Sequence, residues 1–478
     1  MRVTLWVIAA VGLLLGAAGA AAEEVAGLPV HIQRFDPTAI RLWVGDSISS
    51  TATVAIATKK GILVIDTTGH PRVDRELRRI IARELGRSDF EYLVNTHEHG
   101  DHTGGNAVYS DCTIIGHGLV AAGMATQETE RPRFIEWGTT RIADLQRDLS
   151  EQPADTPAAK RLHEQLTLAQ LNLEANQSEE KRIPPTKTFS DHLKLNLGDT
   201  TVEMYWIGGM HSASDIAVFV PEHGLLMTGD TMADVWLTDT PGCLASFGAR
   251  SGIRHDFPRW LANWNILLGK RASIKTFVPG HWNGELSLAG VEARVGYVET
   301  LWQGINQAVA AGKSLADLQA EYRLDARFPA LTDSPGFSRS NNYMTILEMW
   351  STVTKQESAA DQLYALIDSG APESAIRDVL AARDVKPAKY YFLEDQINYS
   401  GYRFLQENKD AQAVSMFRIN VELYPGSWNV YDSLGEALMK TGDVDGAAAM
   451  YERSLELKPD SQSGKDALAR IRAQRTGS

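Results

Sequence analysis

Three histidines and an aspartate lie close together in the segment THEHGDH, which runs from Thr96 to His102. Neutral imidazole and carboxylate groups are good ligands for divalent zinc. With 12 histidines in 478 residues, a chance HxHxDH motif is expected with a frequency on the order of one in a thousand. We therefore interpret His97, His99, Asp101 and His102 as metal ligands, of which two can face one ion and two a second.

A site for two ions needs more ligands than one loop supplies, and later segments offer them. Each candidate follows an expected strand: His211 comes after residues 201–207, Asp230 after 224–228 and His281 after 275–278. A glycine close to each candidate permits a sharp turn that presents the side chain. The sequence thus predicts a set of ligands gathered from several strand ends.

The elements that would position these residues alternate between strands and helices. Runs rich in Val, Ile and Thr predict strands at 53–57 and 61–65, and a helical period predicts a helix at 73–85. A strand at 92–95 then leads into the histidine-rich loop, at the kind of strand end where α/β folds build their sites. Further strands are predicted at 188–197, 201–207, 216–220, 224–228 and 275–278, with a helix at 257–268.

A helical insertion is expected at residues 139–185. Between Thr139 and Glu180 the composition changes to Gln, Glu, Leu, Arg and Ala without glycine, and Pro153 and Pro157 divide the segment in two. We interpret this segment as a helical hairpin that packs on its own domain, with a lid or a dimer contact as alternatives.

After about Leu301 the strand patterns stop and the chain is predicted to be helical. Four kinds of residue recur at an interval of 34 residues: Gly401 and Gly435, Ala413 and Ala447, Phe417 and Tyr451, Pro425 and Pro459. This interval and order resemble tetratricopeptide repeats. A generic helical tail is the alternative, and residues 361–383 are expected to supply a degenerate third repeat.

The ligand candidates, in their order along the chain, resemble the metallo-β-lactamase superfamily over roughly Ile40–Trp282. The resemblance implies an α/β fold, an αββα sandwich of two mixed sheets, with a dinuclear zinc site between the sheet edges. It implies that His97, His99 and His211 hold the first metal, that Asp101, His102 and His281 hold the second, and that Asp230 bridges both. Asp66 matches an aspartate that is not a ligand but would hydrogen-bond the histidine-rich loop.

The same resemblance implies a metal-dependent hydrolase in which a metal-bridging hydroxide attacks an ester, thioester, lactone or related bond of a small molecule. Asp101 would be the catalytic residue that orients the hydroxide and handles a proton. β-Lactamases of the family usually carry Cys or Ser where Asp230 stands, and its alkylsulfatases carry glutamates in place of His211 and Asp230. Alkylsulfatase- or β-lactamase-type hydrolysis is retained as an alternative, as are iron or manganese in place of zinc.

A binding protein is the alternative from another class, with a working tetratricopeptide-like region and a non-catalytic metal domain. We expect residues 23–300 to be the catalytic domain, 301–357 a helical connector and 358–478 the all-α tetratricopeptide-like domain. The tail would serve a homo-oligomer or a protein partner. The net charge of −13 is spread along the chain without a basic face, which excludes a nucleic-acid partner.

Residues 1–22 are expected to be a signal peptide. Arg2 precedes the apolar run Leu5–Leu15, and small residues follow up to Ala22. The apolar run is short for a membrane span of about 20 residues, and no cysteine follows that could carry a lipid. The mature protein is therefore expected to be periplasmic or secreted, without a stable membrane anchor.

Several aromatic residues lie near the expected ligand loops. Trp236 and Trp282 are candidates for an apolar pocket, with Trp137 and Phe134 beside the same loops. His70, His117 and His255 lie outside the ligand motifs and are expected to be satisfied loop or core histidines. The two cysteines, Cys112 and Cys243, could form one disulfide or be small buried side chains.

Overall fold

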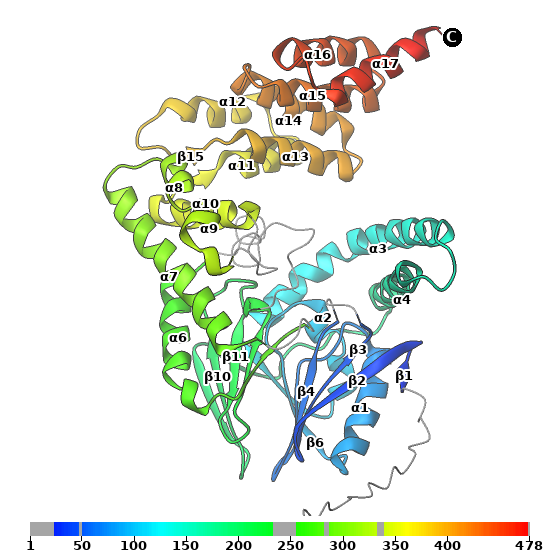
Figure 1. Ribbon diagram of the computed structural model, residues 1–478, viewed down its shortest axis with the longest axis vertical. Helices are drawn as coiled ribbons and strands as arrows, with labels where there is room; N and C mark the ends of the chain where they lie inside the picture. The colour runs from blue at the N-terminus through cyan, green and yellow to red at the C-terminus, as the bar shows by residue number, and fades with distance from the viewer. Residues whose placement is uncertain (1–22, 47–49, 233–254, 282–285, 332–338, 477–478) are drawn as a thin grey trace, which may run out of the picture. The chain divides into compact units, whose positions relative to one another are not determined.

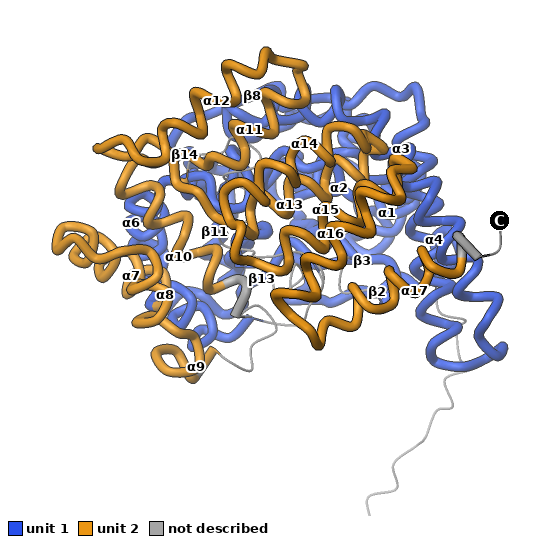
Figure 2. The backbone as a smooth tube through the Cα atoms, turned by 90° about the horizontal axis from the view of Figure 1, so that it is seen from above, with its two compact units in different colours: residues 1–244, 256–296, 333–337 blue, residues 245–255, 297–332, 338–478 orange. Residues whose placement is uncertain are grey.

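The computed structural model describes residues 23–46, 50–232, 255–281, 286–331 and 339–476. The chain divides into two compact units, shown in different colours in Figure 2. The first comprises residues 1–244, 256–296 and 333–337, and the second comprises residues 245–255, 297–332 and 338–478. The predicted signal peptide, Trp236, Trp282 and Cys243 lie outside the described residues. Cys112 is buried and its thiol is free.

The first unit contains two mixed β-sheets. One has eight strands in sequence order: β1 (Glu24–Val25), β2 (Leu28–Asp36), β3 (Ala39–Val44), β4 (Thr53–Thr58), β5 (Gly61–Ile65), β6 (Phe90–Val94), β7 (Thr113–His117) and β8 (Lys187–Phe189). The other has the order β13 (Thr276–Pro279), β12 (Leu225–Gly229), β11 (Ile216–Val220), β10 (Thr201–Trp206) and β9 (His192–Asn196). Strands β5 to β8 pair in parallel, as do β12 and β13, and the remaining neighbours are antiparallel.

The alternation of side chains along the strands builds the layers. On β4, Val54 and Ile56 belong to the core between the two sheets, whereas Ala55 belongs to the core on the opposite face. Helix α1 (Pro71–Leu85) covers that opposite face with Leu77 and Ile81, which are fully buried. Successive residues of a strand point to opposite faces of the sheet. Because both faces of β4 are buried, consecutive residues in its middle must be apolar.

Helix α6 (Phe257–Gly269) covers the outer face of the second sheet, as α1 covers that of the first (Figure 1). Its Asn263 Nδ2 donates to the carbonyl of Trp206 at 2.9 Å, and Trp260 and Trp264 are fully buried. Asp256 caps the helix by accepting from the backbone N–H of Arg259. The layers therefore run helix, sheet, sheet, helix, and the predicted αββα sandwich is confirmed.

A long helical hairpin interrupts the sandwich between β7 and β8. Its helices are α3 (Val120–Ser150) and α4 (Pro157–Gln177), and Thr156 caps α4 through the backbone N–H of Ala159. The sequence predicts the first helix only from Thr139, but α3 starts at Val120 and contains Pro132. A proline inside a helix removes one backbone hydrogen bond, and here packing against α4 maintains the helix through it.

The second unit is almost entirely helical. Its connector contains α8 (Leu315–Glu321), α9 (Leu324–Arg327) and α10 (Arg339–Thr354), while α7 (Leu288–Ala310) spans the boundary of the two units. The remaining helices are α11 (Ala359–Asp368), α12 (Glu373–Ala381), α13 (Glu394–Gln406), α14 (Asp410–Leu423), α15 (Trp428–Thr441), α16 (Val444–Leu457) and α17 (Gln462–Thr476). One prediction is wrong in detail, because Glu357–Ser358 (β14) and Tyr390–Tyr391 (β15) form a short parallel pair.

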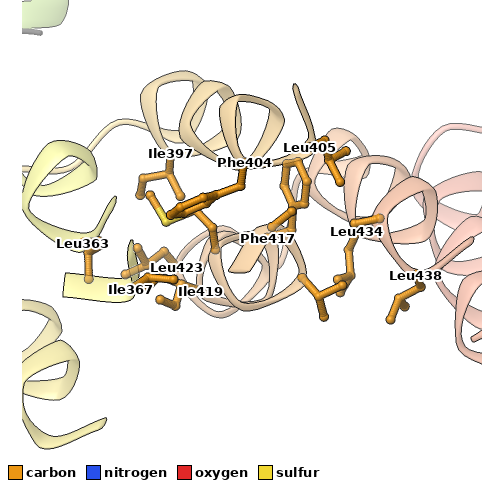
Figure 3. Close-up of a cluster of buried hydrophobic side chains, with 14 of the residues drawn as sticks. Leu363, Ile367, Ile397, Phe404, Leu405, Phe417, Ile419, Leu423, Leu434 and Leu438 are labelled. Carbon is orange, nitrogen blue, oxygen red and sulfur yellow. The ribbon is translucent and has the colours of Figure 1, made fainter. Parts of the chain in front are cut away.

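The 34-residue interval has a structural counterpart. Helices α13 and α15 begin 34 residues apart, as do α14 and α16, and consecutive helices pack side by side. Phe417 of α14 fills the space at Gly401 of α13, where an added Cβ would lie 2.4 Å from its ring. Leu434 and other apolar side chains continue this core from helix to helix (Figure 3). None of the helices in the described parts of the chain is both long enough and apolar enough to span a membrane.

Candidate metal centre

The predicted ligands occupy the carboxyl ends of strands from both sheets. Strand β6 leads into the loop that carries His97 and His99 and into the short helix α2 (Gly100–Thr103). In the second sheet, His211 follows β10, Asp230 follows β12 directly and His281 follows β13. The facing edges of the two sheets therefore bring together residues that are distant in the sequence.

Three groups of three ligand atoms form among the described residues, each with all its atoms within 4.8 Å of one another. The first contains His97, His99 and His211, the second contains Asp101, His102 and His281, and the third, His97, His102 and Asp230, links these two. In the first, His211 Nε2 lies 2.9 Å from His99 Nδ1. In the second, His281 Nε2 lies 3.2 Å from both His102 Nε2 and Asp101 Oδ2. These first two groups have the members that the family resemblance implies for two separate metals.

Asp230 lies between the two groups. Its Oδ2 is 3.0 Å from His281 Nε2 and 3.5 Å from His211 Nε2, while its Oδ1 is 3.5 Å from His102 Nε2. The carboxylate is fully buried, and a Cβ on Gly280 would lie 2.2 Å from its Oδ1. Only glycine at position 280 leaves room for a carboxylate that faces both groups.

The side chains fit a pair of divalent cations. His97 Nε2 is buried and has no hydrogen-bond partner among the described residues, although it faces Asp230 Oδ2 at 3.9 Å. A buried polar atom without a partner is costly, and a cation at this position would satisfy it. Imidazoles combined with carboxylates are the ligand set that zinc and neighbouring first-row metals accept.

Among the histidines of the centre, some have a lowered pKa and others have a raised pKa. Burial lowers the pKa of His97 well below its usual value, and the neighbouring imidazoles lower it further. Burial likewise lowers the pKa of His211 to about 3. Burial also opposes the charged form of His281, but Asp230 and Asp101 outweigh it and raise the pKa of His281 to about 10. A bound cation would replace the proton that these carboxylates attract.

Asp66 fixes the histidine-rich loop from the end of β5. It has φ +58° and accepts hydrogen bonds from the backbone N–H and the hydroxyl of Thr96, both at 2.7 Å. Its Oδ2 also lies 3.0 Å from His102 Nδ1. With Nδ1 engaged in this way, His102 presents Nε2 to the metal centre, which is the positioning role that the resemblance implies.

Two acidic residues outside the sequence-predicted set hold the ligand loops in place. Glu98, inside the THEHGDH motif, is buried and accepts from the backbone N–H groups of Ala213 and Ser214 at 3.2 and 3.3 Å, as well as from the Ser214 hydroxyl. It thereby joins the first-sheet loop to the loop that carries His211. The spacing gave no signal for this, because the partners lie more than a hundred residues away.

Asp215 performs a similar role within the His211 loop. Its Oδ2 accepts from the backbone N–H of His211 at 2.7 Å and from that of Met210 at 2.9 Å, and its Oδ1 accepts from the Ser212 hydroxyl at 2.7 Å. The run HSASD contains a recognisable signal, since a carboxylate a few residues after a polar turn often accepts its backbone N–H groups.

The aromatic residues and histidines outside the ligand motifs are not members of these groups. Phe134 and Trp137 on α3 are 41% and 63% exposed. His117 Nε2 contacts the carbonyl of Ser190, and the His117 ring stacks on that of Trp206, so its interpretation as a satisfied histidine is confirmed. The two other pocket candidates, Trp236 and Trp282, lie outside the described residues.

Comparisons with known proteins agree with this architecture. The family model described as the metallo-beta-lactamase superfamily matches residues 48–281. The chain is 22% identical over 253 residues to the 2,4-dinitroanisole O-demethylase subunit alpha of Nocardioides sp. (strain JS1661), which covers 52% of this chain and 57% of that relative. The chain thus matches little more than half the length of this curated relative.

Solved structures of similar proteins include a metallo-β-lactamase from Pontibacter korlensis, with 16% identity, a TM-score of 0.36 and coverage of 56% of this chain and 99% of that one. They also include a stereoselective inverting sec-alkylsulfatase from Pseudomonas sp., with 12% identity, a TM-score of 0.45 and coverage of 92% of this chain and 65% of that one. The matched family model and the sandwich fold confirm the resemblance seen in the ligand motifs, and the chain belongs to the metallo-β-lactamase superfamily through its domain at residues 48–281.

Proposed function

We propose that the protein is a dinuclear metal hydrolase that acts on an ester, thioester, lactone or related bond of a small molecule. The observation that carries this proposal is Asp230, a buried carboxylate that faces imidazoles of both ligand groups at 3.0 to 3.9 Å. A metal site with a purely structural role is usually closed and contains a single ion. Two adjoining ligand groups that share a carboxylate favour catalysis instead.

The protein's own residues divide the work between holding and reacting. His97, His102, His211 and Asp230 are buried to within a few per cent and would hold the ions away from bulk water. Asp101 differs, because its side chain is 40% exposed although its Oδ2 lies 3.2 Å from His281 Nε2. His102 and His281 overcome the effect of burial and lower the pKa of Asp101, so its carboxylate is ionised and available to accept a proton at Oδ2.

When bound, a pair of divalent cations would supply an activated water at neutral pH and would polarise the scissile bond. We propose zinc, with iron or manganese as alternatives, because imidazole and carboxylate ligands suit all three. Around this pair, Asp66 and Glu98 would keep the histidine-rich loop in its shape through their hydrogen bonds to Thr96 and Ser214.

The test is hydrolysis by the zinc-loaded full chain on a chromogenic panel: carboxyl ester, thioester, lactone, β-lactam, phosphodiester and alkyl sulfate. Because the curated relative is named for demethylation of 2,4-dinitroanisole, that aryl methyl ether joins the panel. Activity on one class that is lost in Asp101→Ala would support the proposal and identify the bond. Full turnover in Asp101→Ala, or no turnover of any substrate with two metals bound, would contradict it.

We also propose export, because residues 1–22 have the pattern of a signal peptide. Mass spectrometry of the protein isolated from its native cell is the test. A mature amino terminus at Ala21 or Glu23 in a periplasmic or secreted fraction is expected, and an intact amino terminus in the cytoplasmic fraction would contradict export.

For the helical tail we propose a tetratricopeptide-like binding or oligomerisation role. The repeated helix pairs support it, as does a pocket of about 710 Å³ lined by Glu394, Asp395, Asn398, Tyr399, Tyr402, Gln406 and Asn429. Removal of the residues after Glu357 should change the oligomeric state or solubility while the metal content stays the same. Loss of metal together with the tail would show that the predicted domain boundary is wrong.

A further inference from the structure

The segment 178–186, which follows α4, is fixed to the first unit at several points. The contacts are Arg131 Nη2 to the carbonyl of Ser178, Arg75 Nη2 to the Glu180 carboxylate at 2.9 Å, Asn106 Nδ2 to the carbonyl of Ile183 at 2.8 Å, and Thr186 N to the carbonyl of Ile114 at 2.8 Å. They lie on both sides of Arg182. The backbone that carries this arginine is therefore held in place before any ligand arrives, which lowers the entropy lost on binding.

This fixed segment places the Arg182 guanidinium against the histidine-rich loop. A Cβ built on Gly100 would lie only 3.2 Å from Arg182 Nη1. Gly100 stands between the ligands His99 and Asp101, and Asp101 is the ligand with a 40% exposed side chain. Arg182 thus lies beside the open part of the metal centre.

Few of the N–H groups of Arg182 have a hydrogen-bond partner among the described residues. Its Nη2 donates to Asn176 Oδ1 at 3.2 Å, and no carboxylate of the described residues lies within 4.0 Å of it. Burial lowers the pKa of Arg182, with Glu128 and Asp101 opposing this effect, but a guanidinium stays protonated under such conditions.

Arg131, on the neighbouring helix α3, shows the opposite arrangement. It forms an ion pair with Glu128 at 2.6 Å, and it donates from Nε to the carbonyl of Asn176 at 2.6 Å and from Nη2 to that of Ser178. In these contacts the charge and the N–H groups of Arg131 stabilise the helical hairpin. The charge and most N–H groups of Arg182 are not used in this way, and they can bind a ligand.

We propose that Arg182 binds an anionic group of the substrate, a carboxylate or an equivalent oxyanion, beside Asp101. A half-buried guanidinium with free N–H groups recognises such an anion through paired, charge-assisted hydrogen bonds. The substrate is thus a small molecule with a negative group separate from the bond that is cleaved. This inference rests on the proposed hydrolase function and adds the substrate class to it.

The test uses the zinc-loaded full chain with two matched esters, mono-4-nitrophenyl glutarate and 4-nitrophenyl valerate, whose acyl chains end in a carboxylate and a methyl group. Free glutarate and sulfate are titrated by calorimetry as separate anion probes. The variants are Arg182→Gln, Arg182→Lys and, as the matched control, Arg147→Gln, which removes an exposed arginine of α3 paired with Asp144; the metal content of each is measured.

Loss of a charge-assisted pair should weaken glutarate binding in Arg182→Gln by about tenfold or more. The KM for the glutarate ester should rise by a similar factor without a change in kcat, the valerate ester should be unaffected, and Arg182→Lys should restore part of the loss. If the affinity for sulfate falls from the native protein to Arg182→Lys to Arg182→Gln, the site also accepts sulfate. If the affinity for sulfate does not change in this way, the site is specific for carboxylates.

Equal glutarate affinity in Arg182→Gln and Arg147→Gln would overturn the proposal. An equal loss on both esters, or a loss of metal, would overturn it as well, because Arg182 would then act only on the shape of the ligand loop. If neither ester is cleaved by any variant, the hydrolase assignment for esters fails, while the glutarate titration still decides whether Arg182 binds the anion.

Discussion

The metal loops and the repeated helices are both well-packed regions, yet their interiors are opposite in kind. Around Asp230 the buried atoms are nitrogens and oxygens, and His97 Nε2 has no hydrogen-bond partner in the described parts of the chain. Around Phe417 the buried side chains are apolar and recur from one helix pair to the next. A polar interior without partners raises the energy of the protein alone and is explained by a ligand, whereas an apolar interior stabilises the protein by itself.

The glycines of the two regions make the same contrast. Gly280 leaves space for a carboxylate, and Gly401 leaves space for an aromatic ring. Substitution in the first region should therefore change metal binding and activity, and substitution in the second should change stability.

Removal of the shared ligand should have the largest effect. In Asp230→Ala both ligand groups lose their common carboxylate, so activity on the substrate found in the panel should fall by about a thousandfold or more. Metal content, measured by plasma mass spectrometry, should fall in parallel. Asp111→Ala, which removes a surface carboxylate paired with Arg78, is the control and should keep both. A variant Asp230→Ala that retains its metals would refute the bridging role.

The hydrogen bonds of Glu98 should matter less, because Glu98 acts through the His211 loop. Glu98→Gln keeps the size of the side chain but weakens its bonds to Ala213 and Ser214, and the affinity of the first metal should fall about ten- to a hundredfold. Competition with a chromogenic chelator measures this affinity, and Glu203→Gln is the matched control. Unchanged affinity would show that the two loops hold their positions independently.

In the helical region, substitution of either repeated glycine, Gly401 or Gly435, should change only the stability of the protein, and the two substitutions should do so by different amounts. A methyl group on Gly401 meets the Phe417 ring at 2.4 Å, whereas one on Gly435 meets Tyr451 at 3.0 Å. Gly401→Ala should therefore destabilise the second unit by about 1–3 kcal/mol. In Gly435→Ala, the better helix propensity of alanine, about 1 kcal/mol, offsets most of a smaller clash. Thermal unfolding tests whether Gly401→Ala is the more destabilising of the two substitutions. The metal content should be unchanged in both variants, because these glycines lie in the helical region and not at the metal centre.

The smallest effect concerns a carboxylate away from both regions. Burial opposes the charge of Glu203, but hydrogen bonds from Lys270, Tyr205 and Lys194 outweigh it and lower its pKa to about 2, from 4.5 in the unfolded chain. Because the folded pKa is depressed, Glu203 stabilises the protein fully above pH 4.5, and this contribution is lost as the pH falls towards 2. The difference in unfolding free energy between the native protein and Glu203→Gln should shrink over that range. A difference that is constant with pH would contradict the pKa assignment.

The strands, and the residues that the structure gathers at the candidate metal centre, could be predicted from the sequence for reasons that are local. Strand β5 has the predicted bounds, Gly61–Ile65, because an apolar run between turns has few other structures available. His211, Asp230 and His281 could be found because each follows a strand, and strand ends of facing sheets converge.

The parts that were missed depend on contacts between distant segments. Helix α3 passes through Pro132 because α4 packs along it, which the local sequence cannot show. Glu98 contacts the backbone of residues 213 and 214, and Arg182 reaches Gly100, through the folding of separate loops onto one another. Carboxylate and guanidinium side chains at such positions look like ordinary surface residues until the fold brings their partners to them.

The central claim is that two ligand groups joined by Asp230 hold two divalent ions, and the most direct test is to count the ions per chain. The full chain and Asp101→Ala are loaded with zinc, freed of excess metal and analysed by plasma mass spectrometry together with amino-acid quantification. The account predicts about two zinc ions per chain for the native protein and about one for Asp101→Ala, because Asp101 belongs only to the second group. A native protein that holds a single ion, or an Asp101→Ala variant that keeps two, would contradict it.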